Sequence, residues 1–86
     1  EAEINLKGEK MTKYTIRYHL KKENPYSVWN DTEELIEDNL SYGEALYWSF
    51  RELAKYVQLG YLAQNEADSM RGDIEAYNNF INKLVG

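Results

Sequence analysis

The 86-residue sequence contains no cysteine, a single proline and a single histidine. Without cysteine the chain has no disulfide, no thiolate zinc site and no cysteine nucleophile. It contains no apolar run near the ~20 residues of a membrane span, and we expect no signal peptide. Its aromatic content of 14% is typical of a chain with a folded core. We therefore expect one small cytoplasmic domain.

Motifs for catalysis are missing as well. The five glycines are scattered, so no glycine-rich phosphate loop is present. No serine lies in a nucleophile-elbow pattern or next to an evident base, and the acidic residues do not follow EF-hand spacing. We therefore expect a non-enzymatic protein that needs neither a metal ion nor a cofactor.

The net charge of −5 is unevenly distributed along the chain. Residues 7–22 contain six basic residues and one acidic residue, whereas residues 23–50 contain seven acidic residues and no basic one. The remainder is close to neutral. An acidic balance disfavours attraction to phosphate backbones and favours basic partners.

An alternation of apolar and polar residues marks the basic segment. Tyr14, Ile16, Tyr18 and Leu20 alternate with polar residues, which predicts a half-buried strand whose apolar side chains face the core. Asn24-Pro25 should end it. We assign residues 11–29 to a β region, with a short extended piece at its end.

The first ten residues allow two interpretations. Met11-Thr12-Lys13 looks like a natural start, which would make residues 1–10 foreign to the natural chain. Alternatively, Ile4 and Leu6 form the first strand of a hairpin.

The rest of the sequence has helical spacing. Asp31 and Glu34 resemble a capping box and predict a short helix over residues 31–40, and Ser41 with Glu44 predicts a second start. Two amphipathic helices follow in residues 41–85 and should pack as an antiparallel hairpin. The predicted fold class is α+β. An N-terminal β-hairpin or small antiparallel sheet packs on the short helix and the C-terminal helical hairpin.

Trp48 is the first candidate for a binding residue. On a helix its neighbours Glu44, Arg51, Glu52 and Lys55 are all charged. A tryptophan in such an arc is either covered by the strand layer or exposed as an anchor for a partner. Tyr47, at the edge of the same arc, would extend the exposed patch.

The acidic run is the second candidate. Carboxylates in the first turn of a helix are explained by its dipole, but not all members of this run are. A row of carboxylates can imitate a phosphate backbone, as in small acidic antirestriction and anti-CRISPR proteins of phages. The carboxylates assigned to this surface are Glu33, Glu34, Glu37, Asp38 and Glu44.

A basic stripe on the strand gives an alternative function. Alternation puts Lys13, Arg17, His19 and Lys21 on the outer face, where they could contact the phosphates of a nucleic acid. The stripe has no aromatic stacking residues on its own face, and lysines at an edge strand also block unwanted pairing. The cations beside His19 make it a poor metal ligand.

The sequence thus favours a protein-interaction module. We expect a small acidic inhibitor of the phage or mobile-element type, which binds a basic surface of a nucleic-acid-handling protein. The alternatives are a nucleic-acid-binding domain that uses the basic stripe and a homo-oligomeric assembly subunit that associates through Tyr47 and Trp48.

Overall fold

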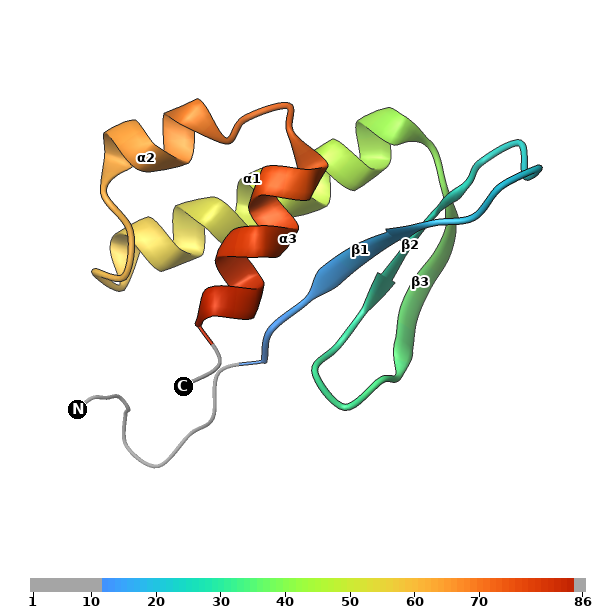
Figure 1. Ribbon diagram of the computed structural model, residues 1–86, viewed down its shortest axis with the longest axis horizontal. Helices are drawn as coiled ribbons and strands as arrows, with labels where there is room; N and C mark the ends of the chain where they lie inside the picture. The colour runs from blue at the N-terminus through green and yellow to red at the C-terminus, as the bar shows by residue number, and fades with distance from the viewer. Residues whose placement is uncertain (1–11, 85–86) are drawn as a thin grey trace.

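The computed structural model describes residues 12–84, in which three strands precede three helices (Figure 1). The predicted first strand at Ile4 and Leu6 lies outside the described residues. The elements are β1 (Thr15–Tyr18), β2 (Tyr26–Trp29), β3 (Leu35–Leu40), α1 (Tyr42–Gln58), α2 (Gln64–Ser69) and α3 (Ile74–Lys83). The α+β class and the small antiparallel sheet are confirmed.

The strands form one antiparallel sheet in the order β1-β2-β3. Ile16 lies opposite Val28, and both are buried. The strand β1 is shorter than the alternation predicts, because the chain turns after Tyr18. Lys21 adopts a φ of 69° in that turn, and Tyr18 and Leu20 are 57% and 75% exposed, so neither belongs to the buried core.

The prediction of a helix over residues 31–40 is wrong, because these residues form a turn and the strand β3. The Asn30 side-chain oxygen accepts hydrogen bonds from the backbone N–H groups of Thr32 and Glu34, at 3.0 and 2.9 Å. Glu33 has a φ of 64°, which a helix does not allow. The local capping signal is therefore overruled by an Asx-type turn and by pairing with β2.

The helix α1 begins where the sequence predicts. Ser41 and Glu44 form a reciprocal capping box, in which each side chain accepts a hydrogen bond from the other residue's backbone N–H. The buried face of α1 includes Glu52 and Tyr56, whereas Tyr42 is half exposed. Glu52 is tolerated there because its carboxylate lies 2.7 Å from the Lys55 ammonium.

The second predicted helix is divided into α2 and α3. Gly72 lies between them with a φ of 79°, and Asp73 then caps α3 by accepting a hydrogen bond from the Ala76 N–H at 3.0 Å. The helical hairpin predicted for residues 41–85 is therefore a three-helix arrangement. α2 begins at Gln64.

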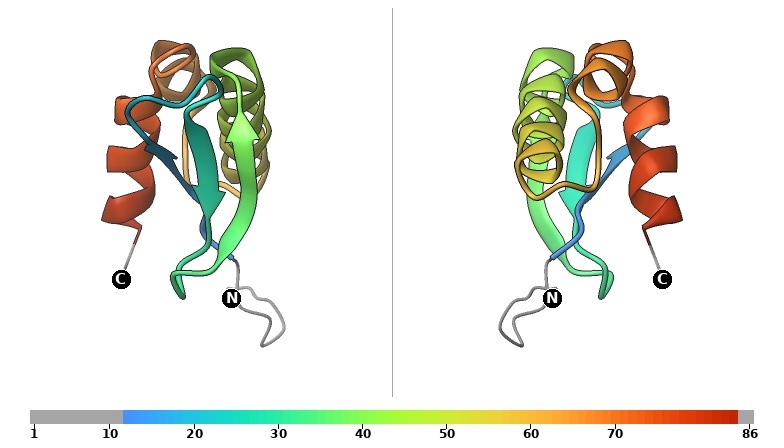
Figure 2. Two further views of the ribbon diagram at one scale, coloured as in Figure 1. Left: turned by 90° about the vertical axis from the view of Figure 1, so that its right-hand side faces the viewer. Right: turned by 90° about the vertical axis from the view of Figure 1, so that its left-hand side faces the viewer.

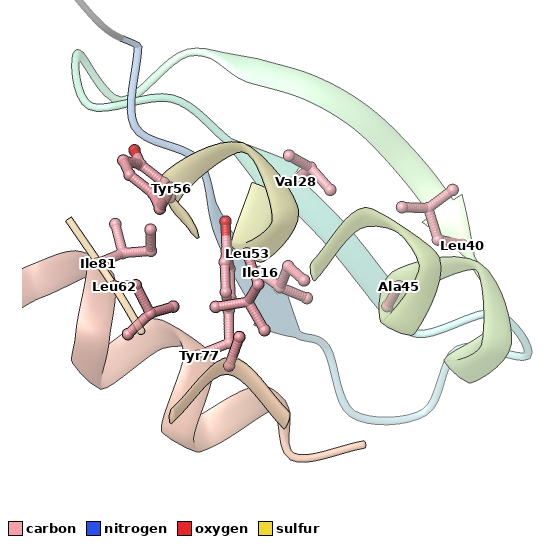
Figure 3. Packing of buried hydrophobic residues seen from close by; sticks show 10 residues of the cluster. Ile16, Val28, Leu40, Ala45, Leu53, Tyr56, Leu62, Tyr77 and Ile81 are labelled. Carbon is pink, nitrogen blue, oxygen red and sulfur yellow. The ribbon is translucent and has the colours of Figure 1, made fainter. Parts of the chain in front are cut away.

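All three helices lie on one side of the sheet, and within residues 12–84 no element covers its other side (Figure 2). The core between the layers joins Ile16 and Val28 of the sheet to Leu53 and Tyr56 of α1 and Tyr77 of α3 (Figure 3). Burial of these apolar side chains provides the main driving force for the fold.

Candidate functional site

Trp48 is half-buried in α1. It is therefore neither fully covered by the strand layer nor fully exposed, which were the two alternatives that the sequence left open. Its ring packs edge-on against that of Tyr14, with centroids 5.3 Å apart and an interplanar angle of 62°. The Arg51 guanidinium lies 5.6 Å from the centroid of Trp48 and also 5.6 Å from that of Tyr47. Tyr47 itself is 61% exposed. The two aromatic rings therefore share one cation.

A groove of about 380 Å³ opens between β3 and the first half of α1. The strand contributes Glu37 and Leu40, and the helix contributes the remaining lining residues. These are Gly43, Glu44, Tyr47, Trp48 and Arg51. The groove thus joins an aromatic wall to carboxylates from two separate elements.

Glu37 and Glu44 supply the carboxylates of this groove. Both side chains are exposed. One Glu44 oxygen accepts the Ser41 N–H at 2.8 Å, which holds this carboxylate at the start of α1. Among the described residues, Glu37 forms no ion pair.

The other acidic residues predicted for this surface lie outside the groove. Glu33 forms an ion pair with Arg17 at 2.6 Å, and Asp38 lies 3.3 Å from the Lys22 ammonium. A hydrogen bond from the Asn39 backbone N–H, together with Lys22, holds the pKa of the Asp38 carboxyl below its ordinary value. Glu34 accepts a hydrogen bond from the Asn30 amide at 2.9 Å in the turn. The acidic run therefore does not form a single row.

The basic stripe is also dispersed. The Arg17 guanidinium stacks 4.3 Å above the Trp29 ring while it pairs with Glu33. Lys13 and Arg17 line a second cavity of about 380 Å³ beside α3, which they share with polar and acidic side chains. Lys21 lies in the turn after β1. In the part of the chain that the structure describes, these cations form no continuous face, because Asp31 and Glu33 lie beside Lys13 and Arg17.

His19 has a partner that the sequence did not reveal. Its Nε2 atom lies 2.8 Å from the Ser27 hydroxyl oxygen, which also accepts the indole N–H of Trp29 at 2.8 Å. A serine beside a histidine is a nucleophile pattern, but Ser27 is completely buried and inaccessible to a substrate. The two hydrogen bonds of Ser27 thus link the side chains of His19 and Trp29 on the side of the sheet that the helices do not cover.

Three lining residues of the groove were missing from the sequence prediction: Leu40, Gly43 and Arg51. Helical spacing identified Arg51 as a neighbour of Trp48 but did not assign it to a site. Leu40 and Gly43 have no polar, charged or aromatic side chain that would indicate a binding site in the sequence. Only the approach of β3 to α1 makes them part of a groove.

The described residues give no sign of a metal site or a membrane-spanning helix. Within the described residues no group of three or more histidines, cysteines or acidic residues could hold a metal ion. No helix in residues 12–84 is long and apolar enough to cross a membrane. Comparison with protein-family models, curated proteins and solved structures finds no match to this chain.

Proposed function

We propose that the protein is a non-catalytic interaction module that binds a basic surface of another protein. The contact surface consists of the β2–β3 turn, β3 and the adjoining half of α1. The observation that carries this proposal is the groove, in which Tyr47 and Trp48 lie beside the carboxylates of Glu37 and Glu44.

Aromatic residues support a role in binding. Tyrosine and tryptophan provide a large contact area and have few rotatable bonds, so ordering them on binding costs little entropy. Tyr47 is 61% exposed on α1 and, among the described residues, does not belong to the hydrophobic core.

The charge of this surface favours a basic partner. Residues 23–50 contain no lysine or arginine, and Glu34 and Glu37 form no ion pair within the described residues. Surfaces that bind nucleic acid are rich in lysine and arginine. A protein that covers such a surface would inhibit a nucleic-acid-handling enzyme, which is the partner class that we favour.

The test compares two double variants with the same net charge. Glu34→Gln with Glu37→Gln removes two carboxylates from the proposed surface, and Asp68→Asn with Glu75→Gln removes two from α2 and α3. Each immobilised protein is exposed to a nuclease-treated lysate of the source organism or its host, and retained proteins are identified by mass spectrometry across a salt series.

We expect a basic nucleic-acid-handling protein to be retained by the wild type and by the Asp68/Glu75 variant. The Glu34/Glu37 variant should retain less of it, with a weaker dependence on salt. Equal retention by all three proteins would contradict the proposal. Partners recovered only when nuclease is omitted would instead favour nucleic-acid binding, and a dimer mass in light scattering would favour self-assembly.

A further inference from the structure

We propose that the groove between β3 and α1 receives the guanidinium group of one arginine from the partner. This inference rests on the proposed function and specifies how that partner is held. It assigns the groove to a single side chain that supplies both positive charge and a planar stacking surface.

The aromatic wall fits a planar cation. Guanidinium groups bind to tyrosine and tryptophan rings when they lie within about 6 Å of the ring centroid. Arg51 already does so at 5.6 Å from both Tyr47 and Trp48, so these rings accept a cation in the free protein. A partner's guanidinium would stack on the remaining exposed surface of the same rings.

The carboxylates fit the same group. Glu37 reaches the groove from β3 and Glu44 from α1, so carboxylates from two elements could contact one guanidinium. Within residues 12–84, one Glu44 oxygen accepts the Ser41 N–H and the other accepts no hydrogen bond. Two carboxylates against the single guanidinium of Arg51 leave the groove negative. Arginine suits this site better than lysine, since its planar fork bonds to carboxylates while it stacks on rings.

Insertion of a side chain also fits the exposed edge of β3 better than strand pairing does. The register between β2 and β3 shifts at two places, and Asn39 has a φ of 62°. Such bulges interrupt the regular ladder that an added strand requires. A second copy of this chain would also bring the acidic residues of two β3 strands together.

The probe is the peptide acetyl-Gly-Arg-Gly-amide, with a citrulline peptide as its neutral isostere. Indole N–H signals in nuclear magnetic resonance separate the two tryptophans, because Trp48 lines the groove and Trp29 lies on the other side of the sheet. Titration to about 10 mM covers the millimolar range expected for such a small ligand. We expect the arginine peptide to shift the Trp48 signal, with the citrulline peptide and the Trp29 signal giving no comparable change.

Three variants determine the sign of the charge that the groove accepts. Glu37→Gln should weaken binding of the arginine peptide about two- to fivefold, as expected for one exposed ion pair. Arg51→Gln should strengthen it by a similar factor, because it removes the competing cation. Glu75→Gln, at an exposed position on α3 away from the groove, is the matched control and should leave it unchanged. Weaker binding in Arg51→Gln, or an equal response to both peptides, would overturn the proposal.

The two proposals fail in different ways. Loss of partner retention in the Glu34/Glu37 variant, with no Trp48 response to the arginine peptide, would overturn the arginine site and support the acidic binding surface. A Trp48 response specific to arginine, with partner retention unchanged in that variant, would support the groove assignment and contradict the proposed function.

Discussion

The side-chain amide of Asn78 in α3 pairs with both backbone groups of Ile16 in β1. Its oxygen accepts the Ile16 N–H at 3.0 Å, and its nitrogen donates to the Ile16 carbonyl at 2.8 Å. The amide thus occupies the place of a neighbouring strand at this edge of the sheet. The Tyr77 hydroxyl, one residue earlier, donates to the Tyr14 carbonyl at 2.5 Å. The helix α3 therefore satisfies part of the β1 edge, while β3 forms the other edge of the sheet.

Replacing Asn78 with alanine should destabilise the protein, because it leaves two backbone groups of Ile16 without their partner. We expect a loss of about 1–3 kcal/mol in the free energy of unfolding, measured by urea denaturation. Asn79→Ala, at an exposed neighbouring position, is the control and should change stability by less than about 0.5 kcal/mol. Equal losses would show that the amide bonds do not stabilise the sheet edge.

Gly72→Ala should cost about 1–2 kcal/mol, because an alanine at a φ of 79° is strained. The cause is the backbone angle alone, since an added Cβ would meet no atom within 4 Å. Gly43→Ala provides the opposite case. It lies in the first turn of α1 with equally open space, so alanine should stabilise the helix by up to about 1 kcal/mol. If both variants shift the midpoint of thermal unfolding in the same direction, this explanation is contradicted.

Stability should decrease at alkaline pH because of buried tyrosines. Burial raises the pKa of Tyr77, and nearby Glu52 adds to this effect; burial likewise raises the pKa of Tyr56. Above pH 10 the unfolded chain therefore loses protons that the folded protein retains, and the free energy of unfolding falls with rising pH. The stability that these two groups contribute is fully present below pH 10.

Tyr77→Phe tests the alkaline effect. The variant should be less stable at neutral pH, because it lacks the hydrogen bond to the Tyr14 carbonyl. Its loss of stability above pH 10 should nevertheless be shallower than that of the wild type. Urea denaturation at several pH values measures both effects. Parallel curves for the two proteins would contradict a raised pKa at Tyr77.

Ser27→Ala should remove the hydroxyl that accepts the Trp29 indole N–H and is hydrogen-bonded to His19 on the open side of the sheet. We expect a loss of about 1 kcal/mol, together with a shift and faster hydrogen exchange of the Trp29 indole N–H. The control is Ser69→Ala, whose exposed hydroxyl donates only to a carbonyl of its own helix. An unchanged indole signal in Ser27→Ala would disprove the hydrogen bond.

The groove shows how far the sequence prediction reached for the candidate site. Trp48 and Glu44 could be assigned to one helix surface, because helical spacing places them one turn apart. Their proximity to Glu37 could not be predicted while residues 31–40 were interpreted as a helix. A strand at β3 positions Glu37 beside α1, whereas Asp38 pairs with Lys22.

The sequence by itself determined the features that depend on neighbouring residues. These are the α+β class, the start of α1 at its capping box, and the separation of charge along the chain. Each depends on interactions within a few residues, so local chemistry is sufficient.

Only the tertiary structure decided between competing local signals. Residues 31–40 carry a helical capping pattern, yet pairing with β2 makes them a turn and a strand. The buried face of α1 includes Glu52 because the sheet and the helices cover it from several sides. The contact of Asn78 with Ile16 spans 62 positions in the chain. Such long-range contacts have no local signature, because the free energy of burial and strand pairing outweighs a single capping preference.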